Sequence, residues 1–455
     1  MTTVAGRPAA GSIAARLERL PHSRWHVKVR FLIGAVTFFE AFDQLLAASA
    51  LPVLMKEWHL TTGQATLAVT AGSVGMLLGA LAAGWMGDVI GRVRTVAVGV
   101  AVTGLASLAV AMSTGIELFA LFRFAQGLGI GGVVPVAATY INEIARSDKR
   151  GRFVLLYEMV FPAGLAVATL VSVWVVPNLG WRAMFLIGAL PVLIAVVLPR
   201  HVAESPRWLL ARGRTEEAER VIADIEAEVA RSTRAPLPDP AAAATQEDSA
   251  RGRLRELFTG RYLRRTTVLS GLWFVAYYVN HGISVWLPSL YTRNFGLDLS
   301  SALAYTLLSN VTGLLGTLIV ALLIDRVGRR PALVTALGGS ALALLTLALT
   351  GAVSGGQVAL FASCTTFFVY AINCGLYLYS PELYPTRNRA KGAAFGGLWN
   401  RLGVILGPVA VGAILGSGGS LRLVFAQFAV VAAVGTVIAC FAVETKGRTL
   451  EELNS

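Results

Sequence analysis

Residues 84–94 read GWMGDVIGRVR and residues 325–331 read DRVGRRP, and each stretch follows a long apolar run. The aspartates of the two stretches lie 237 residues apart. Glu143 and Glu382, each in a charged stretch after a later apolar run, lie 239 residues apart. Two similar offsets at corresponding places predict two parallel repeats, an architecture that puts a substrate site between the halves near the middle of a membrane.

The composition excludes an ordinary soluble protein. Of 455 residues, 55% are hydrophobic and only 14% are charged, whereas soluble domains carry roughly 25% charged residues. The apolar runs are continuous and lack the period-two alternation of a membrane barrel, so they predict helices. We therefore predict an all-α membrane protein with twelve transmembrane helices in two pseudo-symmetric six-helix bundles. The predicted spans are 31–55, 64–86, 95–113, 118–141, 154–176, 183–199, 266–291, 301–324, 332–352, 357–380, 392–416 and 421–442.

The positive charge sets the expected topology. An even number of spans puts both termini on one side, and the segments on that side hold 33 of the 39 Lys and Arg residues, against 4 in the loops opposite or at their edge. By the positive-inside rule both termini are cytoplasmic. The net charge of +13 is thus a topology signal and does not predict nucleic-acid binding. The expected location is the plasma membrane, which is the inner membrane if the cell is bacterial.

The spans and polar stretches divide the chain into five expected segments. The central loop carries two helix-start signals, Ser205 before Pro206 and the acidic turn after Thr215. Its later part, residues 231–252, is rich in Pro, Ala and polar residues and is predicted to be a flexible linker. The segments are a cytoplasmic N-terminal segment (1–30), an N-terminal six-helix bundle (31–199), a cytoplasmic central loop with short helices (200–264), a C-terminal six-helix bundle (265–442) and a cytoplasmic tail (443–455).

Several motifs resemble the major facilitator superfamily along nearly the whole chain. DVIGRVR from Asp88 resembles the loop 2–3 signature of that superfamily, and RFAQGLGIGG from Arg123 its helix 4 motif. ESPRWL from Glu204, PELYPT from Pro381 and ETKGR from Glu444 resemble its sugar-porter and synaptic-vesicle-protein-like branches. The resemblance implies a secondary transporter that works by alternating access.

Two features point to one branch within the superfamily. LPHSRWH from Leu20 and FFEAFD from Phe38 resemble the metabolite:proton symporters, which include transporters of niacin and other aromatic or small organic acids. That group usually has Asp where Glu40 stands. The seventh span reads YVNHGIS from Tyr278 and lacks the paired glutamines of sugar porters.

Five charged residues lie well inside the predicted spans, namely Glu40, Asp43, Arg123, Glu158 and Arg401. Intramembrane charge is costly, at about 2.5–3.5 kcal/mol per residue on insertion scales, and usually faces a cavity or a partner. Three acids against two bases leave one carboxyl group without a cation. Such a group can hold a proton near neutral pH, as a proton-coupled carrier requires.

The spacing assigns a proton-coupling role to the first and fourth spans. Glu40 and Asp43 share one helix face, as do Arg123 and Gln126. We expect Asp43 to pair with Arg123 and protonation to break the pair, which would permit a helix movement. The alternatives are a permanent structural pair, or Glu40 as the titrating group.

The substrate site is expected around Arg401, because a planar guanidinium binds a carboxylate bidentately. Organic-anion carriers that resemble this chain also have an arginine in helix 11. The alternative is that Arg401 pairs with Glu158, which the resemblance aligns with a substrate-contacting position of sugar porters. His281 follows Asp43 by 238 residues and is a second candidate for proton binding or substrate contact. The further candidates are amide and aromatic side chains: Gln126, Asn280, Asn373, Asn400, Trp273, Tyr277, Tyr278, Tyr370, Tyr377 and Trp399.

Charged residues of the cytoplasmic loops resemble the inter-helix network that locks the inward gate in this superfamily; the alternative is topology-determining surface charge. They are Asp88, Arg92, Arg94, Glu143, Arg152, Asp325, Arg329, Glu382 and Arg389. The glycines of the fourth span lack the strand that a dinucleotide loop requires, so they predict close helix packing. They are Gly127, Gly129, Gly131 and Gly132. The Asn-Val-Thr sequon at Asn310 lies within the eighth span and is not expected to be glycosylated.

These observations predict proton-coupled uptake of a small organic acid, a class that includes aromatic acids. The alternatives are a sugar or polyol symporter and a non-transporting membrane sensor; a drug-efflux antiporter and a membrane enzyme are less favoured. No cofactor or metal is expected, and the three cysteines are interpreted as small apolar residues. The expected partners are a small-molecule substrate, protons and the lipid bilayer, without nucleic acid and with no requirement for an oligomer.

Overall fold

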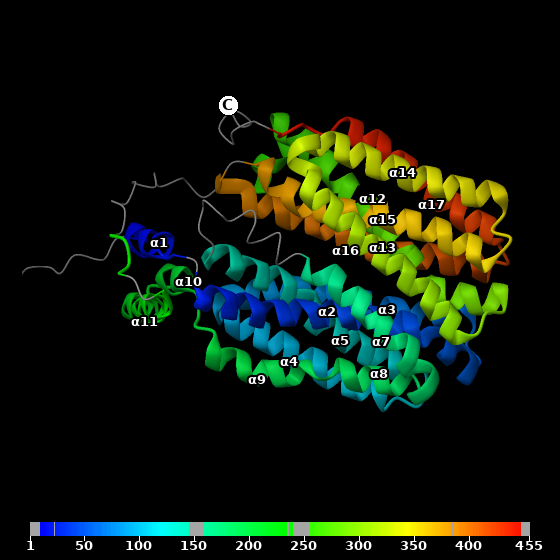
Figure 1. The fold of residues 1–455 in the computed structure, drawn as a ribbon, viewed down its shortest axis with the longest axis horizontal. Helices are drawn as coiled ribbons and strands as arrows, with labels where there is room; N and C mark the ends of the chain where they lie inside the picture. The colour runs from blue at the N-terminus through cyan, green and yellow to red at the C-terminus, as the bar shows by residue number, and fades with distance from the viewer. Residues whose placement is uncertain are drawn as a thin grey trace, which may run out of the picture.

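The computed structural model describes residues 10–21, 23–144, 159–233, 236–239, 254–384 and 386–446, and every element in these ranges is a helix (Figure 1). The N-terminal bundle contains α2 (Arg24–Glu57), α3 (Thr62–Val89), α4 (Arg92–Ala111), α5 (Ile116–Ile144), α7 (Val160–Leu179), α8 (Trp181–Gly188) and α9 (Pro191–His201). The C-terminal bundle contains α12 (Gly260–Phe295), α13 (Leu299–Val327), α14 (Arg329–Thr350), α15 (Gly355–Glu382), α16 (Thr386–Gly416) and α17 (Leu421–Cys440). Outside the bundles lie α1 (Ala10–Glu18), α10 (Pro206–Ala211), α11 (Thr215–Thr233) and the short η1 (Leu254–Phe258).

Within these ranges, eleven helical segments are long and apolar enough to cross a membrane. Helix α12 corresponds to the seventh predicted span, 266–291, and brings the number of spans to twelve, although its polar residues lower its hydropathy. It has 36 residues, about 54 Å at 1.5 Å per residue, and it packs against α2, α15, α16 and α17. The sixth predicted span is broken into α8 and α9, where Pro191 starts the second piece because it has no N–H to continue the first.

The two halves repeat the same turn. Gly91, between α3 and α4, has φ of 106°, and Gly328, between α13 and α14, has φ of 100°. Residues with side chains rarely adopt this backbone conformation, so glycine is required at both positions. The equivalent turns agree with the predicted repeat.

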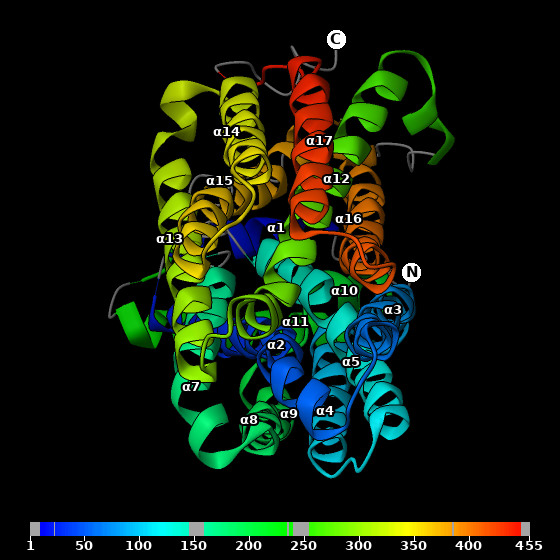
Figure 2. The ribbon, with the colours of Figure 1, turned by 90° about the vertical axis from the view of Figure 1, so that its right-hand side faces the viewer.

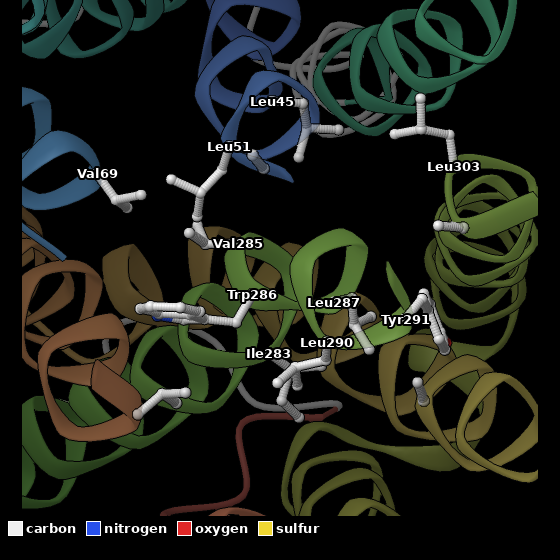
Figure 3. Packing of buried hydrophobic residues seen from close by; sticks show 14 of the residues in the cluster. Leu45, Leu51, Val69, Ile283, Val285, Trp286, Leu287, Leu290, Tyr291 and Leu303 are labelled. Atoms are coloured by element: carbon white, nitrogen blue, oxygen red, sulfur yellow. The ribbon is translucent and has the colours of Figure 1, made fainter. Parts of the chain in front are cut away.

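The two bundles meet along two pairs of helices. Figure 2 shows α3 beside α16 and α7 beside α13, and both pairs are in contact. At the end of the molecule remote from α1, one apolar cluster contains residues of both halves, including Leu45, Leu51 and Val69 opposite Val285 and Trp286 (Figure 3). At the end that carries α1, the buried apolar residues form two clusters, one in each half. The halves are therefore packed together at one end and separate at the other.

The central loop and the N-terminal segment form a small helical unit on the N-terminal bundle. The Ser205 Oγ accepts a hydrogen bond from the Trp208 N–H at 3.3 Å, which confirms the predicted start of α10, and α11 begins at the predicted Thr215. Helix α1 was not predicted. Its Ile13 and Leu17 are buried in one cluster with Ile222 of α11. Most of the predicted linker, residues 231–252, lies outside the described residues.

Candidate functional site

A small cavity lies between the halves near the middle of the bundles. Its volume is about 20 Å³, roughly the room that one water needs. Of the predicted site residues, Arg123 from the N-terminal half and His281 from the C-terminal half line it. Gln44 and Ser73 add two polar groups that the sequence prediction did not include. The cavity is too small for an organic acid, so the described conformation is closed around its centre.

Arg123 is buried on the face of α5 that meets α3. Its Nη1 donates a hydrogen bond to the Gln126 Oε1 at 2.5 Å, so the two residues share a helix face as predicted. Gly72 of α3 makes room for the guanidinium, because a Cβ at position 72 would lie 3.0 Å from Arg123 Nη2. The charge of Arg123 is thus held at the cavity by neutral groups.

The predicted ion pair between Asp43 and Arg123 is wrong for this conformation. Both carboxyl oxygens of Asp43 are buried without a hydrogen-bond partner. Oδ1 points toward Gly188 of α8, next to Ser107 of α4, since a Cβ at position 188 would lie 2.5 Å from Asp43 Oδ1 and 3.0 Å from Ser107 Oγ. The physical reason is the rotation of α2, which turns Gln44 toward the cavity and Asp43 into the N-terminal bundle.

Asp43 still belongs to an electrostatic group with the other predicted residues. The charges of Arg123 and Glu40 both act on it, and Glu40 is itself buried, with 5% of its surface exposed. A carboxylate without hydrogen-bond donors is costly to bury, whereas a protonated carboxyl group has no net charge to desolvate. Asp43 therefore has the surroundings of a group that can carry a proton.

Arg401 reaches from α16 across to the N-terminal half. Its Nη2 donates to the backbone carbonyl of Gly131 in α5 at 3.4 Å. Within the described ranges no carboxylate lies within ion-pair distance of Arg401; Glu158, its predicted alternative partner, lies outside them. Among the described residues the guanidinium thus has a single carbonyl as its acceptor at the boundary between the halves. It retains donors for an anion.

The C-terminal wall of the site is aromatic and polar. Tyr277 stacks on His281 with ring centroids 5.9 Å apart, and the charge of Arg401 acts on the His281 imidazole. His281 Nδ1 is buried without a hydrogen-bond partner. Asn280 accepts a hydrogen bond from Ser284 at 3.3 Å. These contacts bring Arg401, His281 and Tyr277 into one region, as predicted.

The remaining predicted wall residues have different surroundings. Asn373 and Asn400 each have a buried side-chain oxygen without a partner, but neither lines the cavity in its closed form. Tyr377 is 39% exposed and meets the edge of Trp273. Tyr370 donates to Asn310 at 2.7 Å and Tyr278 to Gln427 at 2.6 Å, and Trp399 Nε1 is buried without a partner.

The predicted gate residues form two equivalent networks. Arg92 contacts Asp88 at 2.8 Å and Glu143 at 3.4 Å in the N-terminal half. In the C-terminal half Arg329 contacts Asp325 at 2.8 Å and Glu382 at 2.9 Å. All the ion pairs found between described residues of the bundles stay within one half, so none of them locks the two halves together. Arg152 lies outside the described residues, as does the side chain of Arg389.

Two carboxylates next to these networks were not among the predicted site residues. Glu204 accepts the Arg92 N–H at 2.8 Å at the start of α4, and Glu444 accepts the Arg329 N–H at 3.0 Å at the start of α14. Burial alone would raise the pKa of Glu444, but backbone N–H donors, including those of Lys446 and Arg329, hold that pKa below its usual value. The repeat could have identified both residues, because Glu204 and Glu444 are the first residues of two of the quoted motifs and lie 240 residues apart.

Comparisons with known proteins agree with this architecture. Residues 30–455 match the family described as "Sugar (and other) transporter". The niacin transporter NiaP of Acinetobacter baylyi is 32% identical over 442 residues, which cover 97% of this chain and 99% of that protein. The 4-hydroxybenzoate transporter PcaK of Pseudomonas aeruginosa is 29% identical and covers 93% of this chain and 94% of that one. A partially occluded inward-open structure of the xylose transporter XylE from E. coli aligns with a TM-score of 0.72 at 18% identity, covering 94% of this chain and 100% of that one.

Proposed function

The chain belongs to the sugar (and other) transporter family of the major facilitator superfamily, and on that premise we propose that it carries a small aromatic acid across the membrane together with protons. The relatives named for niacin and for 4-hydroxybenzoate support the aromatic acid. Both compounds join a planar ring to a carboxylate. The site offers groups that suit each part of such a molecule.

The observation that carries the proposal is the positive charge at the boundary between the halves. Arg123 lines the cavity from one side, and Arg401 crosses toward it from the other. Their acceptors in the described structure are a neutral amide and a carbonyl. A carboxylate that enters between the halves would therefore meet two cations that make no ion-pair contact with a described carboxylate, and Tyr277 and His281 would supply flat surfaces for its ring.

Uptake into proteoliposomes tests the substrate class. We expect labelled nicotinate or 4-hydroxybenzoate to accumulate, and nicotinamide, which has the same ring as nicotinate but no negative charge, to compete poorly. Arg401→Lys should weaken binding of the acid about tenfold, because a lysine cannot form the bidentate contact. Arg422→Lys, at the start of α17 and away from the cavity, is the matched control. Competition by xylose but not by carboxylates would instead select a sugar symporter.

An imposed pH gradient tests the proton coupling. We expect Asp43→Asn to abolish accumulation driven by the gradient but to preserve exchange of labelled for unlabelled acid, because exchange requires no net proton movement. Glu40→Gln examines the alternative titrating group in the same assay. Uptake by the wild-type protein that does not depend on the pH gradient would contradict the proposed proton coupling.

We further propose that both termini are cytoplasmic, so that the separated ends of the halves face the cytoplasm. The excess of Lys and Arg on that side supports this orientation. In a cysteine-free background, Glu216→Cys on the exposed surface of α11 should react with an impermeant maleimide only after permeabilisation of the cells. Ser417→Cys, in the loop after α16, should react in intact cells, and the reverse pattern would invert the topology.

A further inference from the structure

A buried polar contact joins the two halves between α7 and α13. The Asn310 Nδ2 donates to the Thr169 Oγ1 at 2.7 Å, and the two residues expose only 2% and 1% of their surfaces. The Thr169 hydroxyl gives its own proton to the Leu165 carbonyl at 2.9 Å, so its oxygen is available as an acceptor. An amide donor from the other half satisfies it.

The same amide continues into the C-terminal half. The Tyr370 hydroxyl donates to the Asn310 Oδ1 at 2.7 Å, and Gly313 leaves room for the Tyr370 ring, since a Cβ there would lie 2.5 Å from it. The orientation of the Asn310 amide follows from these partners. In the flipped orientation its oxygen would face the Thr169 oxygen, whose proton is already used.

The connection then reaches the candidate site. The Ser284 hydroxyl lies beside that of Tyr370 and donates to Asn280 Oδ1 at 3.3 Å. Asn280 precedes His281, which lines the cavity. The Ser284 hydroxyl has one proton and two acceptors, the Asn280 amide oxygen and the Tyr370 oxygen. A ligand that engages the Asn280 oxygen would release this proton to Tyr370.

We propose that Asn310 is a positioning residue that links occupancy at Asn280 to the contact between the halves. The route runs from Asn280 through Ser284, Tyr370 and Asn310 to Thr169, across four helices. Hydrogen bonds in such a chain polarise one another, so a change at one end alters the strength of the bond at the other. In this conformation the last bond of the route holds α7 against α13 and favours the arrangement in which the halves separate at the end that carries α1.

The first test concerns the resting conformation and needs no substrate. Spin labels at Val89 and Val327, exposed residues near equivalent ends of α3 and α13, report the distance between the halves in a cysteine-free protein. We expect Thr169→Val to shift the population toward shorter distances. The ratio of the conformation closed at the end that carries α1 to the separated one should rise on the order of fivefold, which corresponds to the free energy of about one net hydrogen bond.

Thr306→Val is the matched control. Thr306 is also buried, at 4% exposure, and its hydroxyl also donates to a carbonyl four residues earlier, at 2.9 Å. Its hydrogen bond stays within α13. Distances for Thr169→Val that superimpose on those for Thr306→Val would overturn the proposal.

The second test concerns the link to the substrate and rests on the proposed function. We expect Asn310→Leu to keep the dissociation constant of labelled nicotinate within about threefold of the parent while the maximal transport rate falls about tenfold. Ser284→Ala should leave the resting distances unchanged but abolish their response to nicotinate, whereas Ser270→Ala, on the same helix, should preserve it.

The outcomes separate the two proposals. A parent protein that neither binds nor transports nicotinate contradicts the proposed substrate and leaves the distance test of Thr169 intact. If Asn310→Leu weakens nicotinate binding as much as it slows transport, Asn310 acts at the binding site itself and the positioning role is wrong.

Discussion

Gly131 of α5 provides the sharpest test of how the candidate site is built. A Cβ added at Gly131 would lie 1.9 Å from the Met76 carbonyl oxygen of α3, whereas ordinary contacts begin at 3.4 Å. The two helices would have to separate by 1.5 Å to admit a single methyl group. The obstacle is backbone, so no side-chain rotation relieves it. Gly127 lies in the same contact between α5 and α3, where an added Cβ would lie 2.0 Å from the Gly72 carbonyl oxygen.

The expected cost follows from two opposing effects. Overpacking of a close contact typically costs about 1–3 kcal/mol, and a 1.5 Å separation of two helices belongs at the upper end of that range. Alanine is favoured over glycine inside a helix by about 1 kcal/mol. We therefore expect Gly131→Ala to lower the free energy of unfolding by about 2 kcal/mol.

Gly84→Ala is the matched control, because that glycine lies within α3 and a Cβ there would meet nothing within 4 Å. It should gain about 1 kcal/mol from helix propensity alone. Unfolding by SDS titration in mixed micelles would measure both variants against the parent. Equal stability of Gly131→Ala and Gly84→Ala would refute the argument that glycine sets the distance between α3 and α5.

Three further predictions follow from contacts outside the membrane-spanning segments. Burial alone would raise the pKa of Glu226, but Arg16 and Arg19 hold it below its usual value. The stabilisation of α1 by this contact should therefore persist above pH 4.5 and be lost as the pH falls through the lowered pKa. Hydrogen exchange of α1 would show this loss, and exchange that is already fast at pH 7 would contradict the prediction. Glu444→Gln should speed hydrogen exchange at the Arg329 amide, which loses a charged acceptor, and unchanged exchange would show that the cap is dispensable. Ser205→Ala should destabilise α10 by about 1 kcal/mol through loss of its N-cap, measurable as increased proteolysis of the central loop, whereas unchanged proteolysis would contradict it.

Part of the candidate site was predictable because it repeats or depends on local spacing. The shared face of Arg123 and Gln126 follows from a spacing of three residues and is confirmed by their hydrogen bond. The charge networks around Arg92 and Arg329 follow from equal offsets in two repeats. The glycines of the fourth span were expected to pack closely, and Gly131 does so.

The orientation of Asp43 was not predictable in the same way. Spacing shows that Glu40 and Asp43 share a face but not what that face meets, because the rotation of α2 is set by all its neighbours at once. Asp43 consequently points toward Gly188, next to Ser107, instead of Arg123. Helix α1 escaped prediction for a related reason, since its partner α11 lies about 200 residues further along the chain.

The membrane class, the number of spans and the twofold repeat could be predicted from the order of residues alone, because hydropathy, charge and spacing are local properties that survive any packing of the helices. Which polar groups meet depends on the folded arrangement. Asn310 and Thr169 are 141 residues apart, and the Asn-Val-Thr run around Asn310 resembled an unused glycosylation signal until α7 was seen to lie against α13. A hydrogen bond requires two atoms at a set distance and angle, and for residues so far apart in the chain that geometry depends on how the two bundles assemble.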